Sequence, residues 1–177
     1  VCAGCDAPET SNHIMQKCYR SHGRRVARHN CVVNRIKRGL EERGYVVIVE
    51  PSSEGESGTH KPDLVVPRQN HIDVIDVQVT TDGHSLDNAH QPEIQRYDTP
   101  DIRTMIAEIS ALQVTIEFHS ATINWRGIWS GQSVKRLVTK GLLSKYDSHI
   151  ISVQVMRGSL CCFRQFMYYI GYSRDLT

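Results

Sequence analysis

The feature that most constrains this chain is a run of metal-ligating side chains near its start. Cys2-x2-Cys5-x7-His13-x4-Cys18 places three thiols and one imidazole within 17 residues. These are the ligand types and the ligand count of a closed, structural tetrahedral zinc site. Because so short a segment cannot bury a core of its own, bound zinc would supply the free energy of folding. We therefore predict a CCHC zinc-knuckle module over residues 1–23.

Two alternatives to this zinc site remain open. The cysteines are either ordinary thiols or a disulfide pair, or else His22 or His29 replaces His13 as the nitrogen ligand. The other cysteines show no ligand spacing and are predicted to be reduced core residues of an intracellular protein. They are Cys31, Cys161 and Cys162.

Positive charge is concentrated between residues 17 and 43. This stretch holds nine Lys or Arg against two Glu, a net +7, so the remainder of a chain whose total is +2 carries −5. A basic surface beside an acidic body suits a protein that meets phosphates, although a solvated helix face is the alternative. The candidate nucleic-acid-binding residues are Arg24, Arg25, Arg28, His29, Arg35, Lys37 and Arg38.

The first half of the chain alternates between helical and extended patterns. Val26, Val33, Ile36 and Leu40 recur at helical spacing, which predicts a helix over 24–43 that stops at Gly44. Strands are predicted at 45–50, 63–66 and 71–80, with a polar loop at 51–60. The last two strands flank a Pro- and Asn-containing turn and form a hairpin.

The second half continues the same pattern after a polar stretch at 81–91. A helix is predicted from Pro100 with Thr99 as its N-cap, followed by a strand beginning at 114–118. The order over 24–124 indicates an α/β core with a mixed sheet flanked by helices. Residues 125–177 are predicted to form a C-terminal α/β extension, with a helix near 133–143, a strand near 149–156 and a helix ending near 172. The apolar runs fall far short of the ~20 residues that cross a bilayer, so we expect no membrane partner.

Two acidic residues lie on the strands of the predicted hairpin. Asp63 begins one strand, and alternation along the other places Asp76 and Gln78 on one face with Ile72 and Val74. Burying such a carboxylate without a partner costs several kcal/mol, so Asp76 is predicted to bind a cation together with Asp63.

Two carboxylates and a backbone carbonyl such as that of Val77 would leave Mg²⁺ open positions for water and a substrate phosphate. That arrangement suits phosphodiester hydrolysis. The alternative is an ion pair of Asp76 with Lys61 or Arg68 at the strand end.

These residues also resemble a known family. Pro62-Asp63 followed by Asp76-x-Gln78 is similar to the PD-(D/E)xK restriction-like nuclease fold. The wider set of motifs resembles the C-terminal endonuclease segment of site-specific non-LTR retrotransposons of the R-two clade, over essentially the whole chain. These motifs are Cys2-Ala-Gly-Cys5, Glu9-Thr10, His13-Ile-Met-Gln-Lys-Cys18, His22, Arg25, Arg28-His-Asn30, Lys61-Pro-Asp63, Ile75-Asp-Val-Gln-Val79, Ala89-His90, Ile123-Asn-Trp-Arg-Gly-Ile-Trp129, Ser133 and Arg157-Gly-Ser159.

The resemblance implies a function. It makes the chain, which begins at Val1, a piece of a polyprotein whose upstream part is an RNA-directed DNA polymerase. The nuclease would nick double-stranded target DNA in ribosomal RNA genes, in the nucleus, and the new 3′-hydroxyl would prime reverse transcription of the element's RNA. Asp63 and Asp76 would hold the catalytic Mg²⁺, while the zinc module and the basic helix grip the duplex.

The sequence departs from the family pattern in one respect. The fold usually carries a lysine two residues after the second acid, but Gln78 stands there, and no lysine lies between Arg68 and Lys135. Gln78 is then the candidate to orient the attacking water, with Arg96 as a weaker one because arginine is a poor proton acceptor. The alternative function is a catalytically impaired, zinc-dependent nucleic-acid-binding module.

Overall fold

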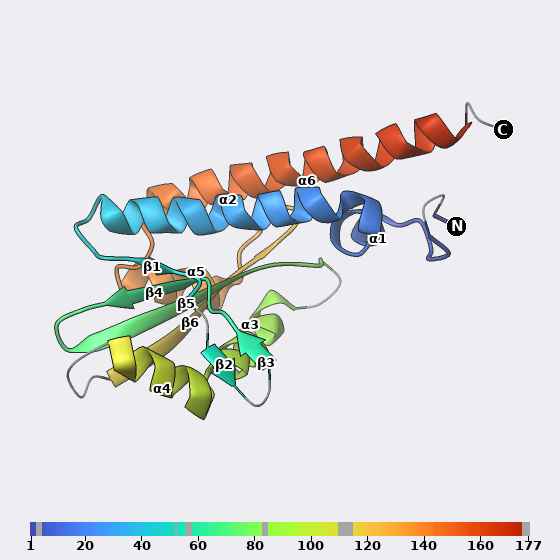
Figure 1. Ribbon diagram of the computed structural model, residues 1–177. Helices are drawn as coiled ribbons and strands as arrows, with labels where there is room; N and C mark the ends of the chain where they lie inside the picture. Colours follow the sequence, from blue (N-terminus) through green and yellow to red (C-terminus); the bar gives the residue numbers. More distant parts are fainter. Residues whose placement is uncertain (3–4, 52, 56–57, 83–84, 110–114, 175–177) are drawn as a thin grey trace.

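The computed structural model describes residues 1–2, 5–51, 53–55, 58–82, 85–109 and 115–174. Two long helices lie side by side across one face of a mixed β-sheet (Figure 1). The helices are α1 (Ser11–Gln16), the 3-10 helix η1 (Tyr19–Ser21), α2 (His22–Glu41), α3 (Leu86–Tyr97), α4 (Pro100–Ile109), α5 (Gly131–Thr139) and α6 (Lys145–Arg174). The strands are β1 (Ile48–Val49), β2 (Ser53–Gly55), β3 (Gly58–His60), β4 (Leu64–Pro67), β5 (His71–Thr80) and β6 (Thr115–Asn124).

Helix α2 confirms the predicted basic helix. Val33, Ile36 and Leu40 are buried, and the chain leaves the helix through Gly44, whose φ of 84° suits glycine. Val26, predicted to share this apolar stripe, is 44% exposed. The first buried positions of α2 are instead Arg28 and Val32, so the buried stripe does not extend back to Val26.

The main sheet has the strand order β1-β4-β5-β6 and is mixed, as predicted. Strands β4 and β5 form the predicted antiparallel hairpin, with Leu64 opposite Ile75. Strand β6 runs parallel to β5 in a continuous register from His71–Thr115 to Thr80–Asn124. A parallel neighbour requires a crossover, which α3 and α4 supply.

Helices cover both faces of this sheet. One apolar core joins α2, α5 and α6 to β4, β5 and β6, and includes Ile36, Ile75 and Ile151. On the other face, Ile102 and Ile106 of α4 pack with side chains of β4, β5 and β6. The predicted α/β class is therefore confirmed, with the alternation of β5 dividing its side chains between two cores.

Several predicted elements differ in extent. Strand β1 is shorter than the predicted 45–50, and a small β2–β3 hairpin lies within the predicted loop at 51–60. Helix α3 begins in the stretch predicted to be polar loop, whereas α4 starts at Pro100 after Thr99 as expected. Strand β6 extends to Asn124, and its polar residues in this second half are buried and paired with β5. Val114, where the strand was predicted to begin, lies outside the described residues.

The predicted strand at 149–156 is wrong, because these residues lie inside α6. Ile151 and Val155 are buried, but Val153 between them is 56% exposed. Burial at i and i+4 is helical spacing, and it overrides the high β-propensity of this segment. The described part of the predicted C-terminal extension thus contains α5 and α6 and no named strand.

The N-terminal residues pack on the C-terminal half of α6. Cys2, Ile14 and Cys18 form an apolar cluster with Phe166 and Ile170. Figure 1 shows α1 close to the start of α2 and beside the C-terminal part of α6. No helix in the described ranges is both long and apolar enough to cross a membrane.

Candidate metal centres and nucleic-acid interface

The basic residues of α2 divide into internal and outward-facing groups. Arg28 is only 3% exposed, and its guanidinium donates to Ser159 Oγ at 2.7 Å and to the Met15 carbonyl at 3.1 Å. Burial lowers the pKa of Arg28 because it disfavours the charged guanidinium, and the hydrogen bonds offset this loss of hydration. Arg28 therefore joins the N-terminal segment to α6 and is not available at the surface.

Arg25 and Arg35 are likewise engaged inside the fold. Arg25 Nη1 donates to the Gln16 carbonyl at 2.5 Å, and Arg35 Nε donates to Asp147 Oδ1 at 2.8 Å. The remaining predicted contacts lie nearer the solvent. Arg24 and Arg38 are exposed, and Lys37 is partly exposed.

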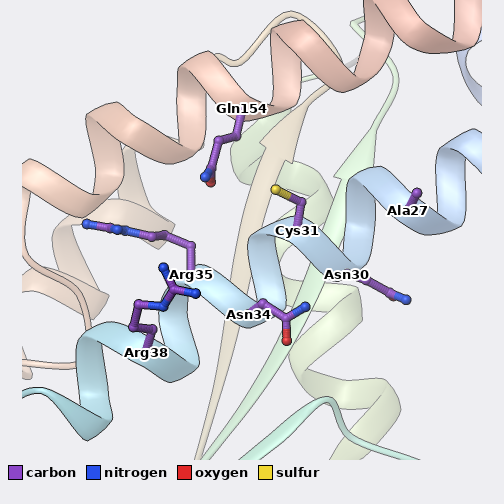
Figure 2. A pocket seen from close by; sticks show the side chains of 7 residues that line it. All are labelled: Ala27, Asn30, Cys31, Asn34, Arg35, Arg38 and Gln154. Atoms are coloured by element: carbon purple, nitrogen blue, oxygen red, sulfur yellow. The ribbon is translucent and has the colours of Figure 1, made fainter.

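A hollow of about 480 Å³ lies between α2 and α6 on this side of the molecule. Figure 2 shows Gln154 reaching from α6 toward Cys31, with Arg35 and Arg38 at one end. The lining also includes Asn30 and Asn34, so the hollow presents amides and guanidiniums. Such groups donate hydrogen bonds to phosphate oxygens.

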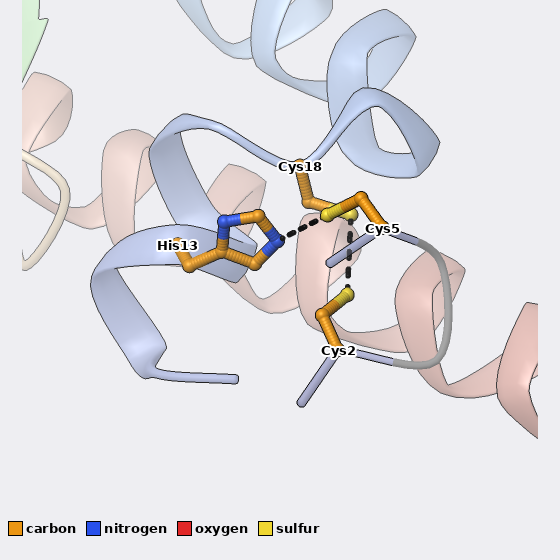
Figure 3. A group of neighbouring side chains, drawn as sticks. All are labelled: Cys2, Cys5, His13 and Cys18. Atoms are coloured by element: carbon orange, nitrogen blue, oxygen red, sulfur yellow. Dashed lines mark hydrogen bonds between the residues drawn. The ribbon is translucent and has the colours of Figure 1, made fainter. Parts of the chain in front are cut away.

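The predicted CCHC residues come together at the N-terminus (Figure 3). One ligand atom from each of Cys2, Cys5, His13 and Cys18 lies within 4.8 Å of the others. Cys5 Sγ is 3.1 Å from His13 Nε2, and Cys2 Sγ is 4.0 Å from Cys18 Sγ. Thr10 caps α1 by accepting a hydrogen bond from the His13 amide at 3.1 Å, which fixes the turn that carries the imidazole.

The environment of this cluster suits a bound cation. Cys2, His13 and Cys18 are at most 8% exposed, and all the cysteines are free thiols. Burial raises the pKa of the Cys18 thiol, and the neighbouring Cys2 and Cys5 raise it further. A bound Zn²⁺ would reverse this effect, because it stabilises thiolates. Three sulfurs and one imidazole are a donor set that zinc accepts.

The hairpin carries both predicted acids. Leu64, which follows Asp63, pairs with Ile75, which precedes Asp76, so both acids lie at the open end of the hairpin. Asp63 and Asp76 are only 7% and 6% exposed, and Asp63 Oδ2 accepts a 2.7 Å hydrogen bond from the Val77 amide. Two carboxylates on neighbouring strands can share a divalent cation.

His29 reaches Asp63 and the Val77 carbonyl from α2, although the sequence predicted a nucleic-acid contact for it. Its Nε2 lies 3.2 Å from Asp63 Oδ2 and 2.9 Å from the Val77 carbonyl oxygen. The hydrogen bond to Asp63, opposed by burial, raises the pKa of His29 to about 9. No sequence spacing indicates this contact, because it depends on how α2 packs across β5.

Gln78 lies one pleat beyond Asp76 on the same face of β5. Its Nε2 donates to Thr122 Oγ1 at 3.1 Å and lies 3.5 Å from Ser120 Oγ. The parallel register pairs Asp76 with Ser120 and Gln78 with Thr122, so the hydroxyls of β6 line this side of the acid pair. The amide group of Gln78 is thereby oriented by the neighbouring strand.

A second cluster, which the sequence analysis missed, lies at the other end of the same strands. Asp73 Oδ1 is 2.7 Å from His119 Nε2, both side chains are fully buried, and Glu117 is close enough to complete a trio of ligand atoms. Positive groups surround it: Arg68 Nε lies 2.7 Å from Asp73 Oδ2, and Arg136 Nε donates to His119 Nδ1.

This second cluster is therefore an internally neutralised ion network. Burial alone raises the pKa of Asp73, but the His119 hydrogen bond and the charges of Arg68 and His71 outweigh it, so that pKa is lowered. Arg68 pairs with Asp73 and not with Asp76, contrary to one alternative drawn from the sequence.

Comparison with known proteins identifies relatives of the chain. No protein-family model matches it. It is 78% identical over 175 residues, or 99% of its length, to the Retrovirus-related Pol polyprotein from type-2 retrotransposable element R2DM of Drosophila melanogaster. The chain therefore matches a segment of a retrotransposon Pol polyprotein.

Two further relatives carry the name Retrovirus-related Pol polyprotein from type-1 retrotransposable element R2. The protein from Bradysia coprophila is 36% identical over 162 residues, or 89% of the chain. The protein from Nasonia vitripennis is 30% identical over 158 residues, or 81% of the chain. The chain spans only 15–18% of the length of these three relatives. Their similarity supports a retrotransposon-related function and nucleic-acid partners in general.

Proposed function

We propose that this chain is the metal-dependent endonuclease segment of a retrotransposon Pol polyprotein, with a restriction-endonuclease-like core. The observation that carries this proposal is the burial of two carboxylates, Asp63 and Asp76, at the open end of the β4–β5 hairpin. The similarity to Pol polyproteins supports it, because insertion of an element requires cleavage of a target.

Asp63 and Asp76 would hold a divalent cation such as Mg²⁺, and their oxygen donors fit that ion. When bound, the cation would stabilise charge on the scissile phosphate and lower the pKa of an attacking water. The Val77 amide holds the Asp63 carboxylate in place through its 2.7 Å hydrogen bond. Gln78, oriented by Thr122, would position the water in place of the usual lysine.

The N-terminal cluster would hold a structural Zn²⁺ and, with α2, grip the DNA. The outward-facing Arg24, Lys37 and Arg38 are the residues we propose for phosphate contacts, since Arg25, Arg28 and Arg35 are engaged within the fold. Such contacts position a duplex without reading its sequence.

The partners of the whole polyprotein form the wider part of the proposal. The target would be double-stranded DNA of ribosomal RNA genes, nicked in the nucleus. The nick would prime RNA-directed DNA synthesis by the polymerase part on the element's RNA.

The test is relaxation of supercoiled plasmid by the zinc-loaded chain with Mg²⁺ or Mn²⁺. We expect nicking by the wild type that is reduced at least 100-fold in Asp63→Asn and Asp76→Asn, with unchanged DNA binding and circular dichroism. Asp101→Asn, which alters an exposed acid of α4, is the matched control and should cleave normally. Cleavage that survives both site substitutions would refute the assignment.

A second candidate function rests on Gln78, which occupies the position of the usual lysine and is held by Thr122. A catalytically impaired, zinc-dependent nucleic-acid-binding module would bind DNA with strong salt dependence and leave the plasmid intact. In that case Gln78→Lys tests whether the missing lysine is the lesion, because it would restore nicking.

A further inference from the structure

Helix α6 forms one outer edge of the molecule (Figure 1) and has a row of exposed apolar side chains in addition to its buried face. The members of this row, which we call the outer stripe, are Val153, Met156, Leu160, Phe163 and Met167, and they are 39 to 56% exposed. We propose that the outer stripe is the docking surface for an amphipathic helix of a partner protein, with acidic residues on both sides of its apolar face. This inference does not depend on the proposed nuclease site.

The outer stripe has the spacing of a seam between two helices. Its successive members are three, four, three and four residues apart, which is the heptad spacing by which helices pack together. The core-facing residues of α6 form a separate stripe, which includes Ile151, Val155, Cys162 and Phe166. Single exposed apolar residues are common, but a row of them on one face marks an interaction site. With a rise of 1.5 Å per residue, the outer stripe is about 21 Å long, which suits a partner helix of about four turns.

A hollow of about 410 Å³ lies beside the middle of the outer stripe. Met156 and Leu160 line it from α6, and Trp125 lines it from the segment that follows β6. Trp125 is fixed in place, because its Nε1 donates to Asn12 Oδ1 at 2.7 Å and its carbonyl accepts from Ser159 Oγ at 2.7 Å. A preformed apolar hollow beside an apolar row suits the apolar face of a bound helix.

Basic side chains lie along both edges of this surface. Arg157 and Arg164 each directly follow a member of the outer stripe, and both are exposed. Arg126 lines the hollow, and its side chain stays 56% exposed although it pairs with Asp82. Helix α6 contains a single acidic residue, Asp147, and that residue is buried. The charges that would complement this surface are therefore acidic and must come from the partner.

The same features disfavour other occupants. A second copy of the chain would bring the same arginines to the outer stripe and no exposed acid of α6 to pair with them. Nucleic-acid phosphates would pair with the arginines but would leave the apolar side chains uncovered. A lipid bilayer is too flat to fill the hollow beside Trp125. A helix with an apolar seam and acidic edges matches the outer stripe, the hollow and the arginines together.

The test is fluorescence anisotropy of a labelled synthetic peptide mixed with the full, zinc-loaded chain. The peptide has three heptads, with Leu at both seam positions and Glu at both flanking positions, whose repulsion keeps it from pairing with itself at pH 7. A second peptide with Lys in place of Glu is the control for charge. Leu160→Ser removes an apolar contact of the outer stripe, and Arg164→Gln removes a flanking charge. Tyr168→Ser is the matched control, because Tyr168 is exposed on the same helix but outside the stripe.

We expect the acidic peptide to bind the wild type and Tyr168→Ser equally, and the basic peptide to bind the wild type at least tenfold more weakly. Leu160→Ser should weaken binding of the acidic peptide about tenfold or more, as loss of a central apolar contact does. Arg164→Gln should weaken it about three- to fivefold, as expected for one exposed ion pair. No binding of the acidic peptide, equal binding of both peptides, or binding that Leu160→Ser leaves unchanged would overturn the proposal.

The other occupants have outcomes of their own. Dimerisation of the wild type in sedimentation velocity that Leu160→Ser abolishes would assign the outer stripe to a second copy. Loss of binding to duplex DNA, or to anionic phospholipid vesicles, in Leu160→Ser would assign it to nucleic acid or to a bilayer. Each of these results would overturn the acidic helix as the occupant. None of the variants alters Asp63 or Asp76, so the nuclease proposal is tested separately.

Discussion

Helices α2 and α6 approach each other so closely at Gly158 that even one added methyl group should destabilise the protein. A Cβ atom at this position would lie 2.7 Å from Arg28 Cγ and 2.9 Å from Arg28 Cβ. The Arg28 Cβ is attached directly to the α2 backbone and cannot rotate away. Gly158→Ala therefore forces the helices apart or displaces a buried guanidinium. At Gly171, further along α6, an added Cβ would meet nothing within 4 Å.

The magnitude follows from two opposing effects. Alanine in a helix interior is favoured over glycine by about 1 kcal/mol. Overpacking a tight contact costs about 1–3 kcal/mol, and moving Arg28 also strains its 2.7 Å hydrogen bond to Ser159. We expect Gly158→Ala to lower the free energy of unfolding by about 1–2 kcal/mol, or the Tm by about 3–6 °C for a chain of this size. Gly171→Ala should raise it by about 0.5 kcal/mol, since it lies near the helix end.

Urea denaturation followed by circular dichroism measures both variants under the same conditions. The two alanine substitutions on one helix should change stability in opposite directions. If Gly158→Ala were as stabilising as Gly171→Ala, helix propensity would dominate at both positions. The close packing of α2 against α6 would then be refuted.

Two further predictions concern the metal cluster and pH. Chelation of zinc should increase hydrogen exchange in residues 11–18 and in α6 around Phe166, because Cys18 and Phe166 share one apolar cluster. Exchange in α2 near Ile36, which belongs to a different core, should not change. Unchanged exchange near Phe166 would contradict this prediction. The lowered pKa of Asp73 means that its carboxylate stabilises the fold above the ordinary value of 3.8 and loses that contribution as pH falls through the folded-state pKa. Asp73→Asn should therefore lower the free energy of unfolding by about 3 kcal/mol at pH 7, measured by urea denaturation. The difference from the wild type should shrink below about pH 4. A difference that does not depend on pH would show that the ionised Asp73 carboxylate does not stabilise the fold in this way.

The sequence predicted those features that depend only on residues close together in the chain. The spacing of Cys2, Cys5, His13 and Cys18 was sufficient to identify a candidate metal cluster, because all four ligands lie within one short segment. The β4–β5 hairpin was also predictable, since one turn sets the register of both strands. Helical spacing in α2 gave its position correctly.

Other features depended on contacts between distant segments. The run at 149–156 suits a strand or a helix, and only packing of Ile151 and Val155 into the core selects the helix. The charge pattern of α2 does not distinguish Arg28, which is buried against Ser159 of α6, from the exposed Arg24. A guanidinium is accommodated inside the protein only when distant carbonyls and hydroxyls happen to surround it.

The candidate catalytic site shows the same division. The sequence by itself identified Asp63 and Asp76 as candidates on the two arms of a hairpin, because strand alternation and a short turn are local properties of the chain. Only the tertiary structure placed His29 beside Asp63 and Val77, which are 34 and 48 residues away in sequence. The position of that imidazole depends on the angle at which α2 crosses β5, and that angle is set by the side chains of the shared core.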